Sequence, residues 1–414
     1  MKGKGTWKWA LMAAVIGFTS CTPEEVITDA DDPTDSDPVE VDDNNGSTTD
    51  YPAIEATFGG RIDIDNLPNY ANQDVPNYIN EDNTDGNDIT DLGATLGRAL
   101  FYDKNLSTDG TVACASCHQQ AYAFSDPLQA SLGVNGSTGR HSMRLINARF
   151  AEEERFFWDE RAPDLEFQTT QPIQDHVEMG YSGQDGNPDF DGLIEVMEGL
   201  DYYNELFTLV YGEPTITEER VQLALAQFVR SIQSFDSRYD EGRARVRNEN
   251  DQFPNFTDQE NQGKGLFMAP PQLNDAGVRI GGGLGCSGCH GAPEFDIDDN
   301  SRNNGFISSL GGGTDTEVTR SPSLRDLINP GGEINGGMMH TGELTTLEAV
   351  IAHYNAIDGT DNNNLDNRLR GGRGNNSRLL NVTAEEEAAI VAFMKTLTGS
   401  DVYTNEKWSD PFEN

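Results

Sequence analysis

Two short cysteine motifs constrain this chain more than any other feature of its sequence. The segments Cys114-Ala115-Ser116-Cys117-His118 and Cys286-Ser287-Gly288-Cys289-His290 each place a histidine directly after two thiols that are separated by two residues. This spacing lets both thiols form thioethers with the vinyl groups of one haem while the histidine binds the iron. A zinc site or a redox dithiol would not require that histidine. The motifs therefore predict two covalently bound haem c groups.

The cysteine count leaves one thiol outside these motifs. It is Cys21, which follows three lysines, an apolar run over residues 9–18 and the small pair Thr19-Ser20. This arrangement is typical of a bacterial lipoprotein signal and is too short to be a dependable membrane span. We expect residues 1–21 to be a signal peptide with a lipidated Cys21. The lipid would anchor the protein to a bacterial membrane, with the outer membrane as the first choice. The folded part would then lie in the periplasm or at the cell surface. An ordinary signal peptide with an incidental Cys21 is the alternative.

The segment after Cys21 has a different composition. Residues 22–55 are rich in acidic and small polar residues and lack apolar periodicity, so they are predicted to form a disordered acidic linker. The formal net charge of the whole chain is −42, which argues against nucleic acid as a partner and favours a basic partner protein.

The remaining sequence looks duplicated. Residues 96–101 and 263–267 form similar glycine- and leucine-containing helix starts ahead of the two motifs, and each half closes on a helix that begins after Thr217 or Thr383. Both threonines are followed by acids and by apolar residues at helical spacing. The chain is predicted to be all-α, with two cytochrome c-like haem domains with long loops at 56–245 and 255–400, joined by a polar passage at about 243–254.

Further segments occur in the order found in one protein family. They are residues 96–101, 123–126, 157–179, 322–325, 340–342 and 347–350. With the two motifs, they make the chain resemble the bacterial di-haem cytochrome c peroxidases, a superfamily that also contains the methylamine dehydrogenase maturation enzyme. The resemblance covers about residues 90 to 400.

The resemblance implies unequal roles for the two haems. The haem on His118 would be the peroxidatic one, with Glu178 as distal acid, Gln168 as neighbouring amide and Trp158 between the haems. The haem on His290 would accept electrons from a small donor protein, a c-type cytochrome or a copper protein. A carboxylate in an apolar pocket can move a proton between the oxygens of peroxide. The alternative for each of these side chains is a plain surface or core position.

The resemblance also bears on the first iron. In some family members a histidine in the loop after the first motif closes this haem, and residues 119–140 contain none. An iron open to peroxide is therefore expected. His141 is the nearest residue that could contradict this.

For the haem on His290, the matching distal position is Tyr354, as in the maturation enzyme. His353 is the second choice as iron ligand, and Met338 or Met339 are less favoured. A phenolate ligand lowers the reduction potential relative to a thioether. Tyr354 could instead pack in its helix without touching iron.

The family further binds calcium between its haem domains, partly through an Asn at the position of His141. Calcium prefers oxygen ligands, so this substitution removes one of them. The carbonyls of Asn335 and Gly337 remain as candidate ligands for one Ca²⁺.

Together these features predict a di-haem peroxidase that reduces hydrogen peroxide to water with electrons from a small redox protein. A maturation-type enzyme that oxidises residues of a partner protein through high-valent haem is the first alternative, suggested by Tyr354. A non-enzymatic electron-transfer cytochrome is the second. A homodimer is compatible with all three.

Overall fold

The folded part of the chain begins earlier than the sequence suggested. The structure is a computed structural model that describes residues 50–151, 155–296, 301–372 and 377–412, so the predicted signal peptide, Cys21 and most of the predicted linker lie outside it. Helix α1 (Pro52–Phe58) starts within the range predicted as linker, 22–55. Its Ile54 and Phe58 are buried in an apolar core, which accounts for the earlier start.

Helices dominate the described residues, as predicted, but three small sheets accompany them. The helices are α2 (Asp91–Tyr102), α3 (Cys114–Cys117), α4 (Leu165–Gln174), α5 (Phe190–Glu198), α6 (Asp201–Tyr211), α7 (Glu218–Ser231), α8 (Arg238–Arg243), α9 (Asp258–Met268), α10 (Leu347–Asn355) and α11 (Ala384–Met394). Short 3-10 turns include η6 (Cys286–Gly288), η9 (Asp401–Tyr403) and η10 (Glu406–Trp408). The antiparallel pairs are β1 (Leu132–Gly133) with β2 (Gly136–Ser137), β3 (Pro271–Leu273) with β4 (Arg279–Gly282), and β5 (Ala356–Asp358) with β6 (Ser377–Leu379). The all-α prediction did not include these small sheets.

One close helix crossing occurs in each half of the chain. A Cβ added to Gly97 of α2 would lie 2.0 Å from the Ala224 carbonyl oxygen of α7. A Cβ added to Gly263 of α9 would lie 1.9 Å from the Ala389 carbonyl oxygen of α11. Only glycine allows the two backbones to approach this closely. The matched crossings support the duplication inferred from the sequence.

The two predicted helix caps are confirmed. The side chain of Thr217 accepts a hydrogen bond from the Arg220 amide at the start of α7, and that of Thr383 accepts one from the Glu386 amide at the start of α11. In α11 the Glu386 side chain also accepts from the Thr383 amide, which completes a capping box.

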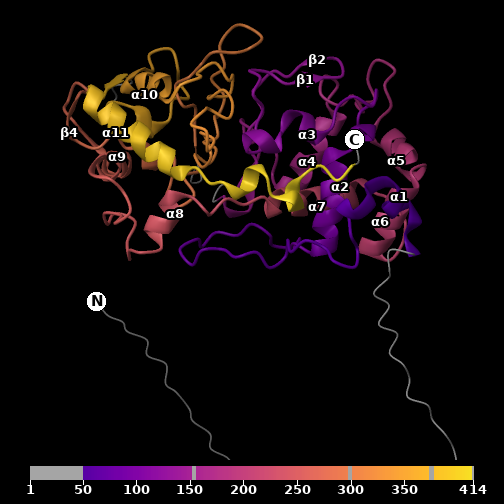
Figure 1. Cartoon of the computed structure of the whole chain (residues 1–414). Coiled ribbons are helices and arrows are strands. Elements are labelled where there is room, and N and C mark those ends of the chain that lie inside the picture. Colours follow the sequence, from indigo (N-terminus) through magenta and orange to yellow (C-terminus); the bar gives the residue numbers. More distant parts are fainter. Residues whose placement is uncertain (1–49, 152–154, 297–300, 373–376, 413–414) are drawn as a thin grey trace, which may run out of the picture. The chain divides into compact units, whose positions relative to one another are not determined.

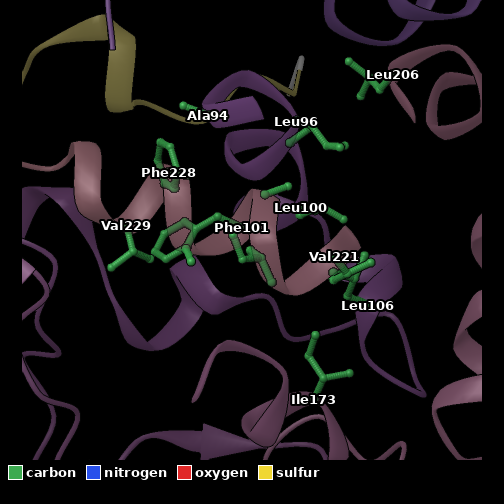
Figure 2. Close-up of a cluster of buried hydrophobic side chains, with 14 of the residues drawn as sticks. Ala94, Leu96, Leu100, Phe101, Leu106, Ile173, Leu206, Val221, Phe228 and Val229 are labelled. Carbon is green, nitrogen blue, oxygen red and sulfur yellow. The ribbon is translucent and has the colours of Figure 1, made fainter. Parts of the chain in front are cut away.

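Two main apolar clusters form the core. In the first, Phe101 of α2 lies beside Phe228 of α7, with ring centroids 5.1 Å apart (Figure 2). The second cluster lies around Phe393 of α11. The C-terminal segment, yellow in Figure 1, runs from α11 back to the helices of the first half. Its Val402 and Trp408 are buried in the first cluster.

The described residues belong to one compact unit, and the domain limits 56–245 and 255–400 stay predictions. Within the described part of the chain, no helix has both the length and the apolar character needed to cross a membrane.

Candidate active site

Both cysteine motifs adopt the same single helical turn. The backbone N–H of His118 donates to the Cys114 carbonyl at 3.0 Å, and that of His290 donates to the Cys286 carbonyl at 3.0 Å. The turn brings the two thiols and the imidazole of each motif to one place. None of the four motif cysteines forms a disulfide.

A backbone carbonyl orients each motif histidine. The Nδ1 atom of His118 lies 3.2 Å from the Phe124 carbonyl oxygen, and the Nδ1 atom of His290 lies 3.0 Å from the Phe295 carbonyl oxygen. Both phenylalanines have left-handed backbones, with φ of 57° and 59°. An Nδ1–H that donates to a carbonyl leaves Nε2 as the nitrogen that binds a metal. Burial lowers the pKa of both histidines to about 4, which keeps them neutral.

The sequence interpretation did not assign this role to the two phenylalanines. A signal for it is nevertheless present. Phe124 and Phe295 follow their motif histidines by six and five residues, and an aspartate, Asp126 or Asp296, comes shortly after each.

Three predicted catalytic side chains line the same cavity as the first motif. This first cavity, of about 430 Å³, has Cys114, Cys117 and His118 in its wall. Glu178, Gln168 and Trp158 lie in the same wall. The structure therefore brings together residues that are up to 64 positions apart in the sequence, from Cys114 to Glu178.

The backbone of Glu178 is fixed by hydrogen bonds of both its amide and its carbonyl. The Asp175 carboxylate accepts from the Glu178 amide at 3.1 Å, and the Glu178 carbonyl accepts from the Val134 amide at 2.9 Å. The side chain itself makes no hydrogen bond to another described residue. Burial, helped by the charge of Asp175 and opposed by Arg161, raises the pKa of Glu178 to about 7. The carboxyl group can therefore gain or lose a proton near neutral pH.

Trp158 connects the first cavity to a second one. Its indole N–H donates to the His141 carbonyl at 2.7 Å, and its own carbonyl accepts from the Arg320 amide at 2.7 Å. Trp158 lines both cavities. Gln168 projects from α4, and its side chain makes no hydrogen bond to another described residue.

The second cavity, of about 170 Å³, surrounds the second motif. Cys286, Cys289 and His290 line it together with Tyr354 of α10. Met338 and Met339 also line this cavity. Burial raises the pKa of the Tyr354 phenol.

His353 is not among the residues of the second cavity. Its Nε2 atom lies 3.2 Å from the carbonyl oxygen of Asn304, a residue that does line the cavity. The choice between Tyr354 and His353 as an iron ligand stays a prediction, and the position of Tyr354 favours the first choice.

Comparisons with known proteins agree with this arrangement. Residues 92–248 match the family model of the di-haem cytochrome c peroxidases. The first half of the chain is thus similar to the di-haem cytochrome c peroxidases. The methylamine utilization protein MauG of Methylophilus methylotrophus is 29% identical over 326 residues, 76% of this chain and 84% of that protein. Cytochrome c551 peroxidase of Nitrosomonas europaea is 26% identical over 322 residues, 74% of this chain and 80% of that protein.

A solved structure is also similar. The crystal structure of a MauG-like protein associated with microbial copper homeostasis superposes with a TM-score of 0.64 at 26% identity, and the match covers 82% of this chain and 99% of that one. The relatives thus include proteins named as peroxidases and proteins named MauG, and they support an oxidoreductase without separating the two activities.

Similarity to the di-haem peroxidases implies covalently bound haem c, and the residues present fit that group. Each cavity offers two cysteines outside any disulfide and a neutral histidine whose Nδ1 is already hydrogen-bonded. The walls around these groups are largely apolar, which suits a porphyrin.

His141, the residue that could contradict an open first iron, is buried and lines both cavities. Its Nδ1 atom lies 3.0 Å from the Leu128 carbonyl oxygen and 3.2 Å from that of Gln129. The loop 119–140 contributes Thr138 and Arg140 to the first cavity. The open iron stays a prediction.

The calcium site implied by the family also stays a prediction. Asn335 is fully buried, and its amide Nδ2 donates to the Asp326 carbonyl at 2.8 Å and the Tyr403 hydroxyl at 2.7 Å. Gly337 packs closely against Gly342. The described residues contain no group of three His, Cys, Asp or Glu placed to hold a metal ion.

Proposed function

We propose that the protein reduces hydrogen peroxide to water with electrons from a small redox protein, a c-type cytochrome or a copper protein. The observation that carries this proposal is the position of Glu178, whose carboxyl group has a pKa of about 7 and lines the cavity of His118. Haem c, when bound in the two proposed haem domains, supplies redox-active iron at both motifs.

The chemistry of O–O cleavage matches what Glu178 offers. One oxygen of peroxide must lose a proton and the other, which leaves as water, must gain one. A carboxyl group with a pKa near the working pH serves as both base and acid. The Gln168 amide lies in the same cavity wall and has both a donor and an acceptor with which to orient peroxide.

Electron supply would use the second cavity. A donor docked near His290 would pass electrons toward the first cavity by way of Trp158, whose ring is fixed by the hydrogen bond of its indole N–H to the His141 carbonyl. A fixed aromatic side chain on both cavity walls shortens the gap that an electron has to cross.

The test is peroxide turnover by the holo-protein with a reduced c-type cytochrome or a reduced copper protein as donor. Glu178→Gln should lose most of this activity. Glu195→Gln, which removes an exposed carboxylate of α5 outside both cavities, is the matched control and should keep it. Equal activity of the two variants would refute the role of Glu178. Two low-spin irons in the electron paramagnetic resonance spectrum of the oxidised protein would refute an open first iron.

Tyr354 favours one second candidate, a maturation-type enzyme that oxidises residues of a partner protein. It lines the second cavity beside Cys286 and Cys289, and the chain is similar to MauG proteins. Peroxide-dependent oxidation of a co-purified protein, without turnover of a reduced donor, would support this candidate. Turnover of a donor at the same rate in Tyr354→Phe would argue against it.

We also propose that a lipid on Cys21 anchors the protein to the outer membrane, in the periplasm or at the cell surface. Incorporation of labelled palmitate into the full chain, and its loss in Cys21→Ser, tests this anchor.

A further inference from the structure

The two cavities have one wall in common. Residues 141–144 of the first half, Trp158, and Arg320 and Pro322 of the second half each line both cavities. We call these residues the shared wall. Trp158 ties its two sides together through its hydrogen bonds with the His141 carbonyl and the Arg320 amide. A side chain of the shared wall can therefore act on a group bound in either cavity.

Arg144 places a cation in the shared wall without a counter-ion. Its Nη2 donates to the Ser323 carbonyl at 3.2 Å, while its Nε is buried and has no hydrogen-bond partner in the described part of the chain. No described carboxylate forms an ion pair with it. Burial lowers the pKa of Arg144 below its ordinary value, but an arginine stays protonated in proteins. The wall thus holds a permanent positive charge.

The buried Arg325, by contrast, is matched by an acid. Arg325 is fully buried, and its guanidinium binds both carboxylate oxygens of Asp240 at 3.0 Å. Asp326 acts on Arg144 electrostatically, but its carboxylate accepts from the Gly399 amide and the Tyr403 hydroxyl instead. A buried charge without a partner is energetically costly. An anion that enters with a cofactor would remove that cost.

Haem c brings such an anion. Its two propionate carboxylates lie on the porphyrin edge opposite the vinyl groups that bind cysteine. The cation that acts on the Cys286 thiol is Arg378, not Arg144. Arg144 belongs instead to the shared wall, where it would be available to the carboxylates of a haem held in either cavity.

We propose that the Arg144 guanidinium is a carboxylate-binding site shared by the propionates of both haems. The proposal rests on the two haems of the proposed function. A guanidinium has five donors in a planar fork, enough to bind two carboxylates at once. One cation shared in this way fixes the position of the two haems relative to each other. Its positive charge also stabilises the reduced form of both irons. The reduction potentials of the two haems are therefore set together.

The test is a spectroelectrochemical titration of the holo-protein, after its haem content has been measured as the pyridine haemochrome. Arg144→Gln removes the charge and should lower both midpoint potentials. Arg144→Lys keeps the charge and should shift them less. Arg149→Gln is the matched control, because Arg149 pairs with Asp82 and lines neither cavity. It should leave both potentials unchanged.

The outcomes separate this proposal from the proposed function. Fewer than two haems in the wild-type protein would contradict the cofactor content on which both depend. Two haems with unchanged potentials in Arg144→Gln, or a shift at one haem alone, would overturn the shared site and leave the peroxidase proposal standing. If Arg144→Gln fails to mature, resonance Raman spectra of Arg144→Lys decide. The propionate bending bands of both haems should shift, and unchanged bands would overturn the proposal.

Discussion

Replacing Glu178 by glutamine should change stability and activity in opposite directions. Burial in the wall of the first cavity raises the pKa of this carboxyl group from 4.5 to about 7. Each pKa unit is worth ~1.4 kcal/mol, so the folded protein favours the protonated form by about 3 kcal/mol. Glutamine has nearly the same shape and cannot ionise. The substitution therefore removes this bias without opening a cavity.

The pH dependence of stability has a definite sign. Between pH 4.5 and about 7 the folded protein keeps a proton on Glu178 that the unfolded chain has lost. The free energy of unfolding contributed by this group therefore falls as pH rises through that window and levels off above it. Relative to wild type, Glu178→Gln should gain nothing at pH 4 and up to about 3 kcal/mol at pH 8. Urea unfolding of both holo-proteins at the two pH values measures the difference.

The same substitution, Glu178→Gln, should lower the activity. A proton-transfer group contributes about 10²- to 10⁴-fold to rate, so peroxide turnover by Glu178→Gln should fall by that factor. In the wild-type protein the rate should rise with pH through about 7, because the ionised carboxylate accepts the first proton of peroxide. A variant that is less stable than wild type at pH 8, or that retains turnover, would show that Glu178 is not a desolvated base.

Three further predictions concern packing, buried charge and electron supply. Gly263→Ala should cost about 1–3 kcal/mol in urea unfolding, because its Cβ would collide with the Ala389 carbonyl, whereas Gly265→Ala on the same helix meets nothing within 4 Å and should be neutral or stabilising. Arg325→Met should lower the free energy of unfolding by about 3–5 kcal/mol, since it leaves buried acids without their cation; a loss below 1 kcal/mol would refute the buried-pair argument. Trp158→Phe should slow donor-dependent turnover more than direct reduction of the first haem by dithionite, and equal slowing of both would contradict a relay through this residue.

Local signals in the sequence predicted the features that depend on a few neighbouring residues. Each helix cap at Thr217 and Thr383 needs only one threonine and the amide three residues later, and both are as expected. The cofactor motifs were recognised for the same reason. The start of the fold was predicted too late, because the burial of Ile54 depends on residues far along the chain.

The features that the sequence did not predict depend on long-range packing. Trp408 is buried in the first core, more than 300 positions from α2, and its indole N–H donates to the Ser231 carbonyl at 3.1 Å. No periodicity near the C-terminus indicates such a contact. The sequence did not indicate the unusual position of Arg144 either, since an arginine in a loop is ordinarily solvated. Only its position between two cavities makes it unusual.

The two halves of the chain share the structural features around their cysteine motifs and differ in the other residues that line their cavities. Both use a glycine crossing, a one-turn cysteine motif and a left-handed phenylalanine whose carbonyl meets the histidine. These features would hold a haem in each half. Because they are the same in both halves, they cannot account for different chemistry at the two haems. The first cavity adds the ionisable Glu178 and the second adds Tyr354, and in the proposed function these additions account for the different roles of the two haems. Exchanging them should therefore alter the chemistry of each cavity while leaving the attachment of both haems intact.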